Sequence, residues 1–362
     1  MKKEDLKLLK ALSEVNGISG NEIEVAKLVK KEIEPFVDSI EFDNLGSIIA
    51  TKKGIPGGPK VLLAGHMDEV GFMVAKVEAN GMLRLHPIGG WWNHVILAEV
   101  MQIVTRNGKV YFGVVGAQPP HGMSPEMRNK VLETKSLYVD LGVASDKEVE
   151  KLGIKVGDPV VPYTEFRVLN DGKTLLGKAW DDRIGVAIGI EVMKRLQNEK
   201  LACDVSFAGT VQEEVGLRGA RTASHFVSPD IAFAIDVTMS YDLPDSPNNP
   251  TKLGAGVALS VLDGSVIAHR GLFEFVENVA KANKIKYTYD MLTAGGTDSG
   301  EIHKQNDGVI TMTLSLACRY FHSHTSLIHY DDYEAAVNLL VEVIKGLDAN
   351  KLAELKKSKY SN

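Results

Sequence analysis

Two adjacent glutamates, Glu213 and Glu214, are the residues of this sequence whose type and spacing point most directly to chemistry. They follow the run Asp204–Thr210, whose apolar character predicts a short strand, and Gly216 interrupts the chain just beyond them. Two like charges side by side are costly to desolvate unless a cation balances them. The pair therefore predicts a metal ligand, Glu214, next to a residue that handles a proton, Glu213.

Four more side chains of the kinds that bind divalent cations occur in the same setting, each after an apolar run that predicts a strand: His66, Asp181, Asp236 and His322. One such coincidence has little weight, because an aspartate at the end of a strand is most often a solvated turn residue. Together with Glu214, these two histidines and three carboxylates fit a two-metal centre much better than chance. Nitrogen and oxygen ligands without thiolate suit zinc, cobalt or manganese.

Asp68 follows His66 by two residues, so in an extended segment the two side chains share a face. The Asp68 carboxylate is therefore predicted to accept the second ring N–H of His66 and to fix the tautomer of that ring. The alternative is a turn aspartate that faces water.

Two loop segments are weaker candidates for contact with a substrate. The segment 295–300 contains Gly296 and Asp298 and can present backbone N–H groups near the metals. It lacks a P-loop lysine and the strand context of a dinucleotide site, which excludes nucleotide binding. His121 lies in the loop 119–122, where a lone histidine is usually not a ligand.

The chain is predicted to fold as an α/β domain with a β-rich insertion. Residues 1–70 and 164–362 alternate helical and strand-like patterns, and Val61–Ala64 is continuously apolar, as in a strand buried on both faces. Residues 71–163 contain short strand-like runs separated by glycines, with a hairpin signal at Asn107-Gly108. This stretch predicts a small β-barrel or β-sandwich inserted into the α/β domain. Near the C-terminus, Asp331–Glu334 resembles a capping box that opens the last amphipathic helix.

The bulk composition limits the partners and the compartment. The 362 residues allow two domains, and a net charge of -6 without a sustained basic block argues against nucleic acid as a partner. No apolar run approaches the ~18 residues needed to span a bilayer, which predicts no membrane partner. The two cysteines, Cys203 and Cys318, cannot form a disulfide framework and fit a reducing cytoplasm.

Several segments taken together resemble the M42 family of metallo-aminopeptidases, the group of glutamyl and tetrahedral aminopeptidases in which some members carry a cellulase-like name. The resemblance covers essentially the whole chain and rests on Ala64–Gly71, Asp181–Arg183, Gln212–Gly216, Ala234–Asp236, Gly295–Asp298 and Arg319–Ser323. It implies a zinc-aminopeptidase-like fold, in which helices flank a mixed central sheet and the inserted domain is barrel-like or PDZ-like.

The resemblance also implies two divalent metal ions per chain, zinc or cobalt in most members. Asp181 would bridge the two ions. His66 and Asp236 would complete one site, and Glu214 and His322 would complete the other. The inserted domain would form dimers, which assemble further into a hollow dodecamer.

For catalysis, Glu213 corresponds to the general base of the family and Asp68 to its orienting carboxylate. The expected reaction is hydrolysis of the N-terminal peptide bond of short peptides. A water bridging the metals attacks the carbonyl, and Glu213 takes its proton and passes it to the leaving amine. One departure concerns substrate preference: many tetrahedral aminopeptidases have proline after the last histidine, whereas Ser323 follows His322 here. His121 matches a family histidine in a Pro-His loop, which suggests contact with the site of a neighbouring subunit.

Three other functions fit parts of the pattern. A glycoside hydrolase also needs two carboxylates, but adjacent residues of an extended segment point to opposite faces, and His66 and His322 stay unexplained. A related di-metal carboxypeptidase or deacylase would carry its extra domain after the acidic pair, whereas here the insertion lies between His66 and Asp181. A catalytically inactive assembly or binding protein ranks lowest, because every expected ligand is present.

Overall fold

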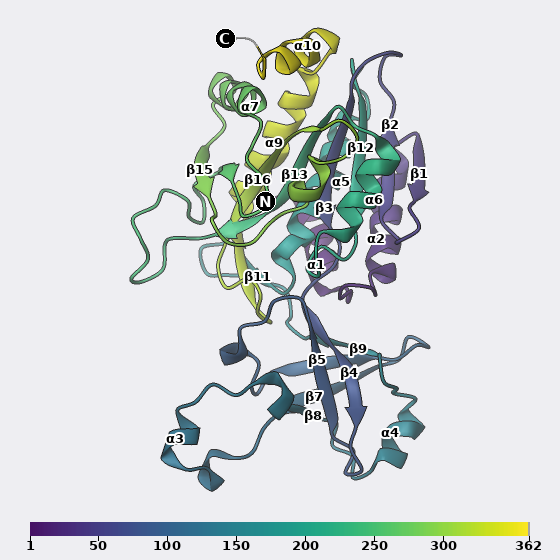
Figure 1. Ribbon diagram of the computed structural model, residues 1–362, viewed down its shortest axis with the longest axis vertical. Helices are drawn as coiled ribbons and strands as arrows, with labels where there is room; N and C mark the ends of the chain where they lie inside the picture. Colours follow the sequence, from purple (N-terminus) through teal and green to yellow (C-terminus); the bar gives the residue numbers. More distant parts are fainter. Residues whose placement is uncertain (361–362) are drawn as a thin grey trace.

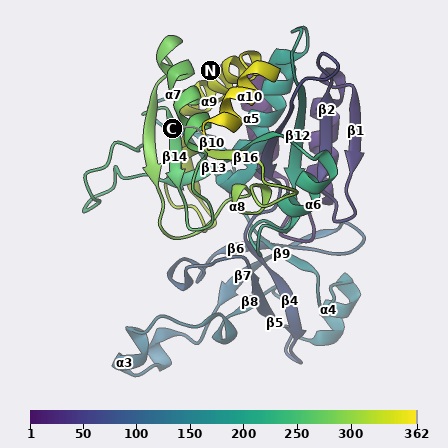
Figure 2. The ribbon, with the colours of Figure 1, turned by 45° about the horizontal axis from the view of Figure 1, so that its top comes forward.

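The structure, a computed structural model, describes residues 1–360 and consists of an α/β body joined to a small β-barrel (Figures 1 and 2). The centre of the body is an eight-stranded mixed sheet. In spatial order its strands are β1 (Ser39–Phe42), β2 (Ile48–Lys52), β12 (Asp204–Thr210), β3 (Lys60–His66), β13 (Ile231–Met239), β16 (Ile310–Cys318), β14 (Val257–Leu262) and β15 (Tyr287–Met291). Strands β12, β3, β13 and β16 run parallel, so their carboxyl ends meet at one edge of the sheet.

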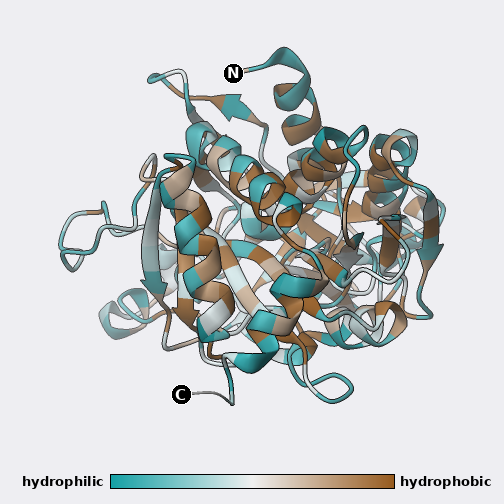
Figure 3. Cartoon of the chain, turned by 90° about the horizontal axis from the view of Figure 1, so that it is seen from above, coloured by the Kyte–Doolittle hydropathy of each residue, from teal (hydrophilic) through white to brown (hydrophobic). Residues whose placement is uncertain are grey.

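Helices cover both faces of this sheet, because its central strands are apolar on both sides. Along β3, Val61 and Leu63 belong to one buried cluster and Leu62 and Ala64 to another, since successive side chains point to opposite faces. The first face packs against α1 (Lys3–Glu14), α2 (Ile23–Ile33), α5 (Trp180–Leu196), α7 (Arg270–Ala282), α9 (Tyr330–Lys345) and α10 (Ala349–Lys357). The second face packs against α6 (Arg218–Val227) and α8 (Ser299–Ile302). Seen from above, the helices turn hydrophobic sides inward and hydrophilic sides outward (Figure 3).

The inserted segment forms a closed antiparallel barrel, so of the two predicted forms the barrel is correct and the sandwich is wrong. Its strands are β4 (Gly71–Val77), β5 (Leu83–Ile88), β8 (Tyr138–Asp140), β7 (Val110–Gly116), β6 (Val100–Val104) and β9 (Pro159–Pro162). Around them lie α3 (Pro125–Arg128), α4 (Asp146–Leu152) and the short turns η2 (Asn93–Val95), η3 (Pro120–Gly122) and η4 (Thr134–Ser136). The barrel has its own hydrophobic cluster, which includes Phe72, Met101 and Val160. With this barrel and the helix-flanked mixed sheet, the predicted fold class is confirmed.

A three-stranded sheet, β10 (Arg167–Val168), β11 (Thr174–Gly177) and β17 (Ser326–His329), leads from the barrel back into the body, and η1 (Glu34–Phe36) follows α2. The predicted capping box at the start of α9 is wrong. The helix begins at Tyr330, and the side chain of His329 accepts the N–H of Asp331 at its N-cap. Asp332 instead accepts the N–H groups of Gly254 and Gly256, so a tertiary contact replaces the local cap. No helix within residues 1–360 has both the length and the apolar character needed to cross a membrane.

Candidate metal centre

The predicted ligands gather at the carboxyl edge of the parallel strands, where the body meets the barrel (Figure 1). His66 is the last residue of β3. Asp236 lies within β13, the strand next to β3 on the side away from β12. Glu213 and Glu214 lie in the loop that follows β12. Side chains that are far apart in sequence meet here because parallel strands end at a common edge, the usual place for a site in an open α/β sheet.

Asp181 lies between the two predicted histidine ligands. It occupies the start of α5 in a non-helical conformation, and its Oδ1 is 3.1 Å from His66 Nε2. Its Oδ2 is 3.2 Å from His322 Nε2, which comes from the loop between β16 and β17. The same His322 nitrogen is 3.4 Å from Glu214 Oε2. One carboxylate therefore faces a histidine on each side.

Two overlapping groups of side chains have the spacing of metal ligands. Ligand atoms of His66, Glu213 and Asp236 lie within 4.8 Å of one another, and so do those of His66, Asp181 and Glu214. Glu213 Oε2 is 3.9 Å from His66 Nε2, so the structure brings the predicted proton carrier into the same cluster as the predicted ligands.

The cluster carries more negative charge than its buried setting favours, which suits a divalent cation. Burial, reinforced by the charge of Asp181, raises the pKa of Glu214 to about 8 and that of Asp236 well above its usual range. Burial raises the pKa of Glu213 as well. For Asp181, hydrogen bonds from His322 and His66 outweigh burial and hold the pKa below its usual range. Within residues 1–360 no group donates a hydrogen bond to the buried Glu214 Oε1, a lone pair that a cation would satisfy.

Asp68 does not make the predicted side-chain contact with His66. His66 Nδ1 is 2.9 Å from the backbone oxygen of Asp68 and 3.6 Å from the nearer carboxylate oxygen. Strand β3 ends at His66, so the alternation that would place the two side chains on one face does not continue. The Asp68 carboxylate instead accepts the N–H groups of Glu213 and Glu214 at 3.0 and 3.1 Å. It orients the acidic loop rather than the histidine ring.

Sequence reasoning missed a buried ionic network that fixes the segment carrying Asp181. Lys178 Nζ lies 2.6 and 2.7 Å from the two carboxylate oxygens of Glu69, and Arg183 donates to Glu69 at 3.1 Å. Arg183 Nε also donates to the backbone oxygen of Met67 at 2.6 Å. Burial lowers the pKa of Lys178 to about 8 despite the charge of Glu69. The signal in the sequence was that Lys178 and Arg183 flank the candidate ligand Asp181 in an otherwise apolar stretch.

The three weaker candidates for substrate contact, Asp298, Gly296 and His121, lie in different surroundings. Asp298 is buried; its Oδ2 accepts a hydrogen bond from Thr210 Oγ1 at 2.5 Å, and its Oδ1 has no partner within residues 1–360. Gly296 lies on the exposed part of the same loop. His121 is exposed in η3, next to α3, which lies at the side of the barrel remote from the sheet edge (Figures 1 and 2). Within one chain, therefore, Asp298 lies near the cluster and His121 does not.

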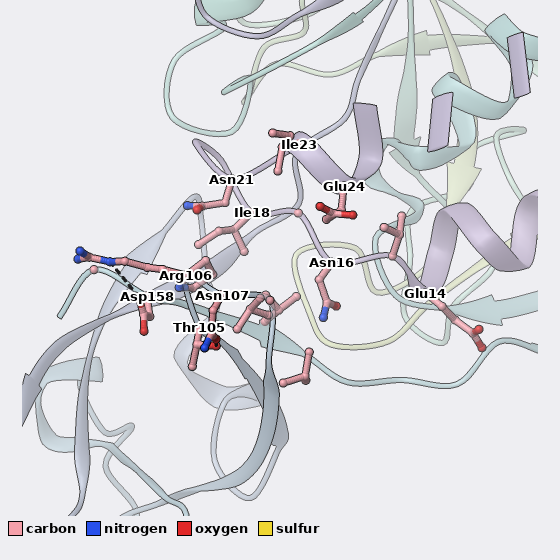
Figure 4. Close-up of a pocket in the computed structure, with 18 residues that line it drawn as sticks. Glu14, Asn16, Ile18, Asn21, Ile23, Glu24, Thr105, Arg106, Asn107 and Asp158 are labelled. Carbon is pink, nitrogen blue, oxygen red and sulfur yellow. Dashed lines mark hydrogen bonds and ion pairs between the residues drawn. The ribbon is translucent and has the colours of Figure 1, made fainter. Parts of the chain in front are cut away.

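A cleft of about 870 Å³ opens beside the domain junction, between the α1–α2 connection and the β6–β7 hairpin (Figure 4). Arg106 and Asp158 line it from the barrel side, with Arg106 Nε 3.5 Å from Asp158 Oδ1. Ile18 and Glu24 line it from the α1–α2 side. None of the predicted ligands lines this cleft.

Comparison with known proteins places the chain among the peptide hydrolases that act as aminopeptidases. It belongs to the M42 glutamyl aminopeptidase family, whose sequence model matches residues 46–339. The glutamyl aminopeptidase of Lactococcus lactis is 34% identical over 96% of this chain and 98% of its own length. The lysyl aminopeptidase of Pyrococcus furiosus is 32% identical over 95% of this chain and 99% of its own length.

Solved structures agree with the sequence comparison. A TET aminopeptidase from a marine sediment archaeon of the Thaumarchaeota superposes with a TM-score of 0.95 at 38% identity, covering 97% of this chain and 99% of that one. The TET1 peptidase of Pyrococcus horikoshii superposes with a TM-score of 0.85 at 33% identity, covering 95% of this chain and all of that one. The latter protein is described as able to assemble into a tetrahedron or a large octahedral shell.

Proposed function

We propose that this aminopeptidase removes the N-terminal residue of short peptides with two divalent cations per chain, zinc or cobalt, with manganese as a further option. One cation would be held by His66, Asp181 and Asp236, and the other by Asp181, Glu214 and His322. The observation that carries the proposal is the Asp181 carboxylate, whose two oxygens face His66 and His322 at 3.1 and 3.2 Å. A carboxylate placed between two histidines can serve two cations at once.

In this proposal Glu213 is the general base. Two bound cations would polarise the scissile carbonyl and lower the pKa of the attacking water. Glu213, held beside His66, would accept the proton of that water and return it to the leaving amine. Asp68 would keep Glu213 in place, because it binds the backbone N–H groups of both glutamates.

The free α-amino group of the peptide needs a negative partner, and Asp298 is the proposed one. Its Oδ1 is buried without a hydrogen-bond donor, and its charge acts on Glu213 and Asp236. An ion pair with an ammonium group would satisfy that oxygen. Gly296, on the exposed part of the same loop, would contact the peptide through its backbone, and His121 would take part only from a neighbouring subunit.

The outer face of the barrel supports the proposal that the chain forms dimers, which then build a dodecamer. Val100, Val110, Phe112 and Val114 leave between 39% and 54% of their surface exposed. Val100 pairs with Val114 across β6 and β7, and Phe112 packs edge-on against Tyr163 with ring centroids 5.1 Å apart. A contiguous exposed apolar surface of this kind is typical of an interaction site. Both cysteines are buried and free, which supports the further proposal of a cytoplasmic location.

A glycoside hydrolase explains fewer of these contacts. It would use two carboxylates, but it assigns no task to the two histidines that flank Asp181. A di-metal deacylase or carboxypeptidase would use a similar cluster on a different carbonyl substrate. Substrates decide between an aminopeptidase and a di-metal deacylase or carboxypeptidase, because these enzymes share the metal chemistry.

The test is a panel of amino-acid p-nitroanilides and short peptides, assayed after chelation and again after addition of zinc, cobalt or manganese. Chelation is expected to abolish release of the N-terminal residue, and one of the metals to restore it. The panel also ranks the preferred N-terminal side chain. N-acylated amino acids and peptides with a blocked N-terminus and a free C-terminus, which are substrates for a deacylase and a carboxypeptidase, serve as controls and are expected to stay intact. Failure to release an N-terminal residue under every metal, or cleavage of cellulose oligomers insensitive to chelation, would contradict the proposal.

A further inference from the structure

Three consecutive backbone N–H groups in the loop after β12 are all bound by carboxylates. The N–H of Gln212 donates to Glu22 Oε1 at 3.0 Å. Those of Glu213 and Glu214 donate to the two oxygens of Asp68 at 3.0 and 3.1 Å. Each of these bonds gives a partner to a backbone donor that would otherwise have none within the described residues. The segment that carries the proposed base is thus fixed by two side chains from other parts of the chain.

Gln212 needs such a restraint more than its neighbours do. Its φ of +56° lies in the left-handed region, which residues with a side chain adopt at a cost. Conformations of this kind persist where surrounding contacts determine them, and they concentrate at functional sites. The bond from Glu22 acts directly on this residue, which immediately precedes Glu213.

Glu22 does not perform the local task that its position predicts. It is the N-cap residue of α2, yet its side chain makes no capping hydrogen bond to that helix. Its Oε1 accepts the N–H of Gly20 at 2.7 Å and the N–H of Gln212, which lies 190 positions further along the chain. The residue is only 6% exposed, and burial together with the charge of Asp68 raises its pKa to about 7. A buried carboxylate therefore serves the loop after β12 and not its own helix.

The α1–α2 connection holds both carboxylates from one side. Ile18 and Asn21 of this connection line the open cleft together with Glu24 in the first turn of α2 (Figure 4). Ser19 instead donates its hydroxyl to Asp68 Oδ2 at 2.6 Å, and Gly20 donates its N–H to Glu22. The connection thus faces the cleft with some residues and fixes the two carboxylates with others.

We propose that Glu22 is a positioning residue for peptide hydrolysis: it holds the backbone of Gln212 so that the Glu213 carboxylate faces the candidate metal centre. The inference rests on the proposed role of Glu213 as the base. Glu22 acts through Gln212 and makes no hydrogen bond or ion pair to a proposed metal ligand in the described structure. Because a displacement of about 1 Å can cost a factor of about 10² in rate, loss of this single bond is expected to lower kcat.

The test separates the position of the acceptor from its charge. Glu22→Gln keeps an oxygen acceptor at the same distance but removes the charge, whereas Glu22→Asp keeps the charge and withdraws the acceptor by one methylene. We expect Glu22→Gln to keep kcat close to the unaltered enzyme, and Glu22→Asp and Glu22→Ala to lose on the order of 10²-fold. KM, bound metal per chain and oligomeric state are expected to stay unchanged. Glu24→Ala, two residues away on the exposed side of α2, is the matched control and is expected to have normal kcat.

Three results would overturn the inference. The first is an unchanged kcat in Glu22→Asp, and the second is a larger loss in Glu22→Gln than in Glu22→Asp, which would assign the effect to charge. The third is a loss of kcat that only follows a loss of bound metal, which would make Glu22 a structural residue. If Glu22→Ala fails to fold, the comparison of the other two variants still decides. Glu213→Gln distinguishes failure of the proposed base from failure of the positioning role. If Glu213→Gln stays active, the proposed base is wrong. If it is inactive and the Glu22 variants have normal kcat, only the positioning role is wrong.

Discussion

The carboxyl edge of the central sheet and the outer face of the barrel both carry residues that do not suit their surroundings, but in opposite ways. At the sheet edge, the ionisable side chains of His66, Glu213 and Asp236 are buried. On the barrel, the apolar side chains of Phe112 and Val114 are 54% and 46% exposed. Both arrangements cost free energy in an isolated chain, since charge is stabilised by water and apolar surface is stabilised by its removal from water.

The difference between the two regions matches the different partners proposed for them. Buried carboxylates whose pKa values are raised by burial and mutual repulsion are stabilised by positive charge in a small volume, which a divalent cation supplies. Exposed valine and phenylalanine side chains are stabilised by another apolar surface of matching extent, which a second protein chain supplies. The mismatch at each place therefore supports the partner proposed for it. Each region can be altered by a substitution that leaves the residues of the other unchanged.

The largest effect is expected from Glu213→Gln at the sheet edge. The amide cannot accept the proton of the attacking water, so kcat is expected to fall by on the order of 10²–10⁴. Two metals per chain and the normal oligomeric state are expected to remain, because the proposed ligands and the barrel face are untouched. Single-turnover kinetics and metal analysis measure this, with the exposed Glu274→Gln as the control. Near-normal peptidase activity in Glu213→Gln would show that the base has been assigned to the wrong residue.

An intermediate effect is expected from Phe112→Lys on the barrel. A charge in the centre of an apolar interface stays unpaired on association, so the assembly is expected to shift toward smaller species by at least about tenfold in dissociation constant. Light scattering and sedimentation measure the shift, and bound metal is expected to stay the same. Phe226 on α6 is 48% exposed and provides the matched control as Phe226→Lys. An unchanged assembly in Phe112→Lys would remove this face from the proposed interface.

The smallest effect is expected on stability, from Glu22→Gln as a function of pH. Folding raises the pKa of Glu22 from 4.5 to about 7, so the folded state holds this proton more tightly and ionisation of the carboxyl opposes folding. The cost is absent below about pH 4.5 and complete above about pH 7. The variant is expected to gain about 1–3 kcal/mol over the unaltered chain at alkaline pH, and the gain should vanish toward pH 4.5. Melting temperatures across this range measure it, and a gain of equal size at every pH would contradict the assignment.

The sequence was sufficient for features that depend on local pattern. Alternating helical and strand-like runs, interrupted by a glycine-rich stretch of short strands, predicted the α/β body and the β insertion that the structure contains. The residues proposed to bind metal could be selected from the sequence because each has a suitable side chain at or near the end of an apolar run, and the structure brings these side chains together. The choice between barrel and sandwich was out of reach, because it depends on which strands pair at the ends, as β4 does with β9.

Only the tertiary structure decided how the charged groups are matched with one another. The local pattern paired the side chain of Asp68 with His66 and made Asp331–Glu334 a capping box, and both pairings were wrong, although α9 does begin at the predicted place. The carboxylates of Asp68 and Asp332 instead bind backbone N–H groups 145 and 78 positions away along the chain. The Glu22 carboxylate accepts the N–H of Gln212, 190 positions away, and no pattern in the sequence predicts this contact. The type of a side chain and its position along a strand can be read from the local sequence. The hydrogen-bond donor that a buried carboxylate binds cannot, because the packing of distant segments decides which donor lies close enough.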